Sequence, residues 1–88
     1  MEFNKDGKID RYYNLDEILR LDLSKEVREN LEQKFGRRVF FDSNGSCKIG
    51  KLCGLEINYQ LGATYYIISD ANNKELFIPV SQSITTIL

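Results

Sequence analysis

The sequence predicts an α+β fold, in which two short N-terminal helices pack on a five-stranded antiparallel β-barrel. Three observations predict it. Apolar residues follow helical spacing within residues 14–36, they alternate with polar residues from residue 37, and turn-forming residues then recur every five to ten positions. Because 88 residues enclose one modest hydrophobic core, we expect residues 1–88 to form a single domain.

Residues 1–13 form the first segment, which we expect to be a β-hairpin. Asn4-Lys5-Asp6-Gly7 suits a type I turn with a glycine bulge, between strands at residues 2–3 and 8–12. The same segment resembles the centre of an EF-hand calcium loop, but Tyr13 stands where a bidentate glutamate is needed. We therefore expect no metal site.

Residues 14–36 form the helical segment, with two helices. Asn14 is a good N-cap for the first helix and Ser24 for the second. Gly36 is expected to end the second helix in a left-handed conformation. The apolar face of the second helix recurs every four residues and consists of Val27, Leu31 and Phe35.

Residues 37–88 form the strand-rich segment. Asn44-Gly45 is a strong hairpin signal, and Gly50 and Gly54 indicate a bend or bulge in the longest strand. The expected strands cover residues 37–42, 47–59, 64–70, 75–80 and 84–88. The residues expected to face the core are Val39, Phe41, Leu55, Ile57, Leu76, Ile78 and Val80.

This third segment resembles the SH3-like small β-barrel in its KOW- or Tudor-like form. The matching pieces are Arg37-Arg38-Val39-Phe40-Phe41, the bent glycine-bearing strand, and Phe77-Ile78-Pro79-Val80-Ser81-Gln82-Ser83-Ile84. The resemblance is one of topology and spacing, so it implies the barrel fold and contains no specific functional motif.

Several kinds of chemistry are excluded by composition. Without histidine, the chain has no Ser-His-Asp or Cys-His site, no histidine-ligated zinc and no histidine pH switch. Two cysteines, Cys47 and Cys53, are too few for a disulfide scaffold and are interpreted as strand residues in a reducing cytosol. The acidic residues are scattered and no glycine-rich phosphate loop is present, so we expect no enzyme and no cofactor.

Charge and hydropathy describe the expected environment. A net charge of −1 argues against a general nucleic-acid coat. No apolar run approaches the roughly 18 residues of a membrane span, and the first residues lack the apolar region of a signal peptide. We expect a cytoplasmic protein without a membrane partner, of the size typical of accessory proteins of phages and mobile elements.

The ten Phe and Tyr residues exceed what the core needs. Phe40 and Phe77 are expected to face outward from the barrel, together with one of the adjacent pair Tyr65 and Tyr66, of which Tyr65 is assigned to the site. Either the helices cover this outer face, or it is an exposed patch that binds another protein. In the second case the protein is a non-enzymatic binding module, an inhibitor or regulator.

Two other partners stay open. A set of basic residues with aromatic neighbours favours RNA or single-stranded nucleic acid as the partner. Its members are Lys34, Arg37, Arg38, Lys48 and Lys51. An uncovered aromatic face or an open edge strand would favour a homodimer, with the option of a shared small-ligand pocket.

Overall fold

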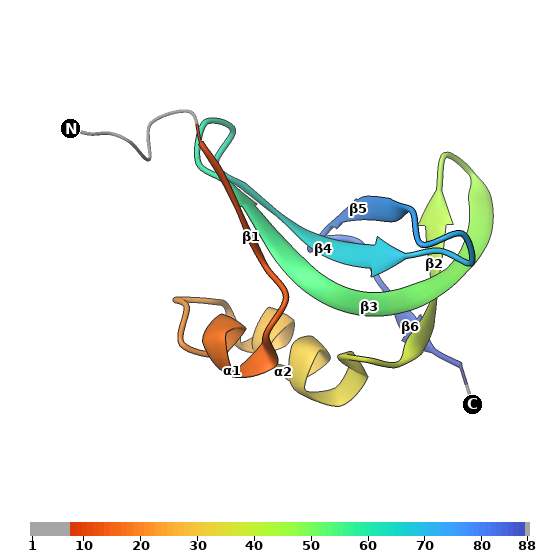
Figure 1. Cartoon of the computed structure of the whole chain (residues 1–88), viewed down its shortest axis with the longest axis horizontal. Coiled ribbons are helices and arrows are strands. Elements are labelled where there is room, and N and C mark those ends of the chain that lie inside the picture. Colours follow the sequence, from red (N-terminus) through yellow and green to blue (C-terminus); the bar gives the residue numbers. More distant parts are fainter. Residues whose placement is uncertain (1–7, 88) are drawn as a thin grey trace.

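An antiparallel sheet of six strands dominates the structure, a computed structural model that describes residues 8–87 (Figure 1). Two short helices lie against the curved sheet, near β1 and β3. The elements in chain order are β1 (Ile9–Tyr12), α1 (Leu15–Ile18), α2 (Lys25–Lys34), β2 (Arg38–Ser43), β3 (Ser46–Asn58), β4 (Ala63–Ser69), β5 (Glu75–Pro79) and β6 (Thr85–Thr86).

The sheet is open, so the predicted five-stranded barrel is wrong. The strand order β5-β4-β3-β2-β6 places β5 and β6 at opposite ends, and no pairing joins them within residues 8–87. Closure requires the two end strands to hydrogen-bond to each other. The strand β6 has only two residues, which pair with β2, and it does not pair with β5.

The strand β3 organises the sheet because its thirteen residues serve three neighbours. Along one edge, its first half pairs with β2 and its last four residues pair with β1. Along the other edge, residues 51–58 pair with β4. The strand β1 corresponds to the second strand of the predicted N-terminal hairpin. The first strand of that hairpin and its turn lie outside the described residues.

The predicted helix ends are confirmed. The side chain of Asn14 accepts from the backbone N–H of Glu17 at 3.1 Å, and Ser24 Oγ accepts from the N–H of Val27 at 3.3 Å. Gly36 follows α2 with φ +80°, a conformation in which glycine carries no Cβ penalty. The longer helix, α2, has ten residues, and no helix in the described part of the chain is long and apolar enough to cross a membrane.

The helices cover one side of the sheet, here called the inner face. Ile18, Val27 and Leu31 belong to the same buried cluster as the inward-facing strand residues. Those strand residues are Val39, Phe41, Leu52, Leu55, Tyr66, Ile68, Ile78 and the following Ile84. The helices therefore do not cover the opposite, outer face, on which the predicted aromatic residues lie.

A β-bulge in β3 changes which residues face outward. The pairing with β4 shifts register between Leu52 and Gly54, so that Leu52 and Leu55 are both buried in the core. Before the bulge, Ile49 and Lys51 therefore lie on the outer face. At Gly54, a Cβ would meet the carbonyl oxygen of Tyr12, so this glycine allows β1 to approach β3 closely.

Candidate functional site

The three predicted aromatic site residues all lie on the outer face, but they do not form one patch. Phe77 in β5 lies opposite Ile67 in β4, and Tyr65 is two residues further along β4. Phe40 lies in β2, which is separated from β4 by β3. The predicted patch is thus divided between the two ends of the sheet.

Phe77 is engaged by the chain itself. The guanidinium carbon of Arg11 lies 4.9 Å from the centre of the Phe77 ring, a cation–π arrangement. The same side chain donates from Nε to Oε1 of Glu56 at 2.8 Å, and this bond is the main cause that raises the pKa of Arg11. Glu56 is only 6% exposed, so this part of the outer face is covered by contacts within the fold.

A second internal contact lies beside it. Tyr13 donates its hydroxyl to Oε2 of Glu75 at 2.7 Å, and this bond, followed by burial, raises the pKa of Tyr13. Burial raises the pKa of the neighbouring Cys53 thiol. Tyr13 and Glu75 are thus joined to each other within the fold.

At the β2–β3 end of the outer face, two apolar side chains are exposed in direct register. Phe40 of β2 is 40% exposed and lies opposite Ile49 of β3, which is 48% exposed. We call these two residues the apolar pair. Thr85 of β6 lies on the other side of Phe40 and is also exposed. Side chains directly opposite on one sheet face are close enough to act as a single contact surface.

Two positive charges stand next to the apolar pair. Arg38 and Lys51 are direct cross-strand partners on the same outer face, and we call them the basic pair. Like charges placed directly opposite destabilise a sheet. Within the described residues neither side chain has a hydrogen bond or ion pair to offset this repulsion.

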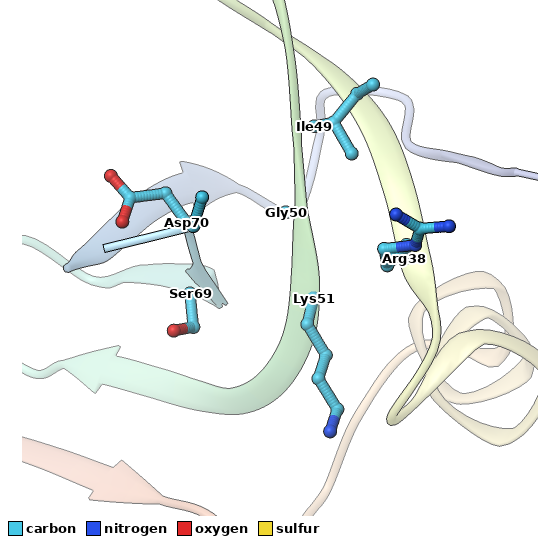
Figure 2. A pocket seen from close by; sticks show the side chains of 7 residues that line it. Arg38, Ile49, Gly50, Lys51, Ser69 and Asp70 are labelled. Atoms are coloured by element: carbon cyan, nitrogen blue, oxygen red, sulfur yellow. The ribbon is translucent and has the colours of Figure 1, made fainter. Parts of the chain in front are cut away.

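The basic pair borders an open groove of about 360 Å³ (Figure 2). The groove lies where β4 turns into β5, because the pairing of β3 with β4 ends at Lys51 and Ser69. Asp70, at the start of that turn, accepts from the N–H groups of Asn72 and Lys74 at 2.8 and 2.9 Å. The lining residues are Arg38, Ile49, Gly50, Lys51, Ser69, Asp70 and Ala71.

The five predicted basic residues are only partly brought together. Arg38 and Lys51 meet as described, but Lys48 lies opposite the buried Phe41 and therefore belongs to the inner face. Arg37 directly precedes β2, and strand alternation gives its side chain the direction opposite to that of Arg38. Lys34 ends α2 and donates to Asn30 Oδ1 at 2.8 Å.

Sequence reasoning missed two residues of this region, Ile49 and Ser69. Simple alternation along β3 places Ile49 on the same side as Leu55, which is the core side. The bulge reverses the alternation between these two residues, so Ile49 faces outward while Leu55 faces the core. The available signal was the pair of leucines three positions apart, Leu52 and Leu55, with a glycine between them.

Among the residues that line the groove, Asp70 provides the one carboxylate. Among residues 8–87, no three His, Cys, Asp or Glu side chains form a cluster that could hold a metal ion. Asp70 lines the groove, but two backbone N–H groups already bind its Oδ1. No protein family, curated protein or solved structure matches the chain.

Proposed function

We propose that the protein is a small, non-enzymatic protein-binding module that regulates or inhibits its partner through the β2–β3 end of the outer face. The observation that carries the proposal is the exposure of the apolar pair, Phe40 and Ile49, in direct cross-strand register. Aromatic residues at the centre of an interface contribute a large share of binding free energy, since their burial removes much apolar area from water.

The surroundings of the apolar pair support the same function. A polar rim around an apolar centre is the usual arrangement of a protein–protein interface. Here Arg38 and Lys51 provide such a rim on one side, and the exposed Asp42 lies two residues beyond Phe40 on the other. Because the basic set is divided between the two faces of the sheet and α2, it offers nucleic acid no continuous track, which favours a protein partner.

The two cysteines support a cytoplasmic location. Cys47 is exposed and Cys53 is half-buried, and both are free thiols. An exposed free thiol is typical of proteins in a reducing compartment.

A pull-down from native lysate tests this proposal. We expect one protein to be recovered with the wild-type chain, and at least about tenfold less with Phe40→Ala or Ile49→Ala, which corresponds to about 1.4 kcal/mol. Leu61→Ala is the matched control, because Leu61 is 69% exposed but lies in the turn between β3 and β4. Equal recovery with all the variants would contradict the proposal.

Two further measurements separate the other partners. Nuclease treatment should leave the recovery unchanged, because the proposed contact contains no nucleic acid. Loss of the captured material after nuclease would instead indicate RNA or single-stranded DNA. Sedimentation of the purified chain should show a monomer; a dimer dispersed by Phe40→Ala would mean that a second copy occupies the face.

A further inference from the structure

We infer that the groove beside the basic pair receives an acidic side chain of the partner protein, carried by an extended segment with an apolar residue two positions away. This inference rests on the proposed function and adds the chemistry of the partner. Three features of the groove support it: the like charges of Arg38 and Lys51, the hydrogen bonds of the neighbouring carboxylates, and the spacing of the two cross-strand pairs.

The basic pair forms no ion pair with the part of the chain that the structure describes. Arg38 and Lys51 lie directly opposite each other, and neither is paired with another side chain in residues 8–87. Such an arrangement costs stability in the free protein. A carboxylate bound beside either cation would reduce the repulsion and gain charge-assisted hydrogen bonds.

The nearest acidic residues are already engaged. Asp70 lines the groove, and its Oδ1 accepts from two backbone N–H groups of its own turn. Glu75 lies opposite Ser69 in β5 and accepts the hydroxyl hydrogen of Tyr13. Within residues 8–87, neither carboxylate forms an ion pair with Arg38 or Lys51, so Asp70 and Glu75 leave both cations without a salt-bridge partner.

The size and composition of the groove suit one small polar group. At about 360 Å³ it lies at the small end of ligand sites, which typically run from about 300 to 1,000 Å³. Ser69 lies opposite Lys51 and adds a hydroxyl donor to the two cations. Figure 2 shows Ser69 and Asp70 to one side of β3, with Arg38 and Ile49 to the other, so the groove is walled by separate strands.

The spacing of the two pairs defines the partner segment. The apolar pair and the basic pair are two residues apart on both β2 and β3, which is about 6.6–6.8 Å along a strand. Side chains two positions apart in an extended segment have the same separation and project to the same side. A segment lying along the strands therefore presents an apolar residue to Phe40 and Ile49, and an Asp or Glu to the groove.

A random peptide library displayed on phage, selected against the immobilised full chain, tests this inference. We expect the enriched peptides to share an apolar residue followed or preceded at two positions by Asp or Glu. Binding of an enriched peptide, measured by fluorescence anisotropy, should weaken about tenfold when its acidic residue is replaced by the corresponding amide. Arg38→Ala and Lys51→Ala should weaken it similarly.

Matched controls isolate the groove from overall charge. Arg20→Ala and Lys25→Ala remove the same charge from exposed positions next to and within the helices, and they should leave peptide affinity unchanged. Lys51→Glu should abolish the selection for acidic residues, because the new carboxylate pairs with Arg38. A library selected against this variant should show no enrichment of Asp or Glu.

The remaining outcomes distinguish this inference from the proposed function. Enriched peptides that carry no acid but lose binding to Phe40→Ala would overturn the inference and leave the protein-binding function standing. Acid-containing peptides that bind the Phe40→Ala and Ile49→Ala variants with the same affinity as the wild type would contradict the proposed binding face. Lack of enrichment, or salt-sensitive binding of a short oligothymidylate that Arg38→Ala abolishes, would overturn both.

Discussion

Arg11 of β1 and Glu56 of β3 are direct cross-strand partners, joined by a hydrogen bond of 2.8 Å from Nε to Oε1. The glutamate side chain is 8% exposed, whereas that of the arginine is 46% exposed. The guanidinium also lies over Phe77 of β5, so one side chain connects three strands on the outer face. Phe77 is therefore aromatic and outward-facing, but its ring is partly covered by a side chain of the same chain.

Removing Arg11 alone should lower the free energy of unfolding more than replacing both Arg11 and Glu56. Arg11→Ala leaves the Glu56 carboxylate buried without its donor, and a buried, unpaired charge is strongly unfavourable. We expect urea unfolding to give a lower midpoint for Arg11→Ala than for the double variant Arg11→Ala/Glu56→Gln. Effects that simply add would mean that the two residues do not interact.

Reversing the charge at Lys51 should stabilise the protein. Glu at this position lies opposite Arg38 and replaces a repulsive cross-strand pair with an attractive one. We expect Lys51→Glu to raise the free energy of unfolding by about 0.2–1 kcal/mol, measured by urea denaturation. The control Lys8→Glu makes the same charge change at an exposed position away from Arg38 and from the helix ends. A destabilised Lys51→Glu would show that the lysine is held by contacts within the fold.

Helix α2 is attached to the sheet by a buried tyrosine. The Tyr66 hydroxyl accepts from Asn30 Nδ2 at 3.0 Å, and burial raises the pKa of this fully buried tyrosine. We expect Tyr66→Phe to lower the free energy of unfolding by about 1 kcal/mol, because the amide loses its acceptor. Tyr65→Phe, on the outer face of the same strand, should change it by less than about 0.5 kcal/mol. Equal effects would argue against the hydrogen bond.

Local features of the fold were predictable from sequence because neighbouring residues decide them. Asn14 and Ser24 act as caps, and Asn44 and Gly45 both have the positive φ of the hairpin turn. Barrel closure was not predictable, because it depends on whether β5 and β6 meet. That is a long-range pairing which the spacing of strands along the chain does not encode.

The candidate site was predictable only in part, for a similar reason. Alternation correctly predicts that Phe40 faces outward and that its sequence neighbours Val39 and Phe41 face inward. Continued along β3 from Leu55, alternation wrongly places Ile49 inward, because it passes over the bulge between Leu52 and Gly54. Alternation also does not reveal that Arg11 covers Phe77 from a strand 66 positions earlier in the sequence. Such contacts arise from tertiary structure, and residue type alone does not determine them.

The turn that walls the groove should depend on pH through Asp70. Hydrogen bonds from the N–H of Lys74 first, and of Asn72 second, lower the pKa of this carboxyl below its ordinary 3.8. The folded state thus favours the carboxylate, so the stabilisation is present above the ordinary pKa and is lost as the pH falls through the lowered one. Asp70→Asn keeps an acceptor oxygen but not the charge.

We therefore expect the wild type to be more stable than Asp70→Asn near pH 7, with a difference that shrinks as the pH falls below about 4. Urea unfolding at several pH values measures the difference, and an NMR titration of the side-chain carboxyl carbon measures the pKa directly. A difference that grows at low pH would mean that the turn favours the protonated acid. Asp70 would then not be held by its own backbone, and its carboxylate, in place of a partner's, would be available to Arg38 and Lys51.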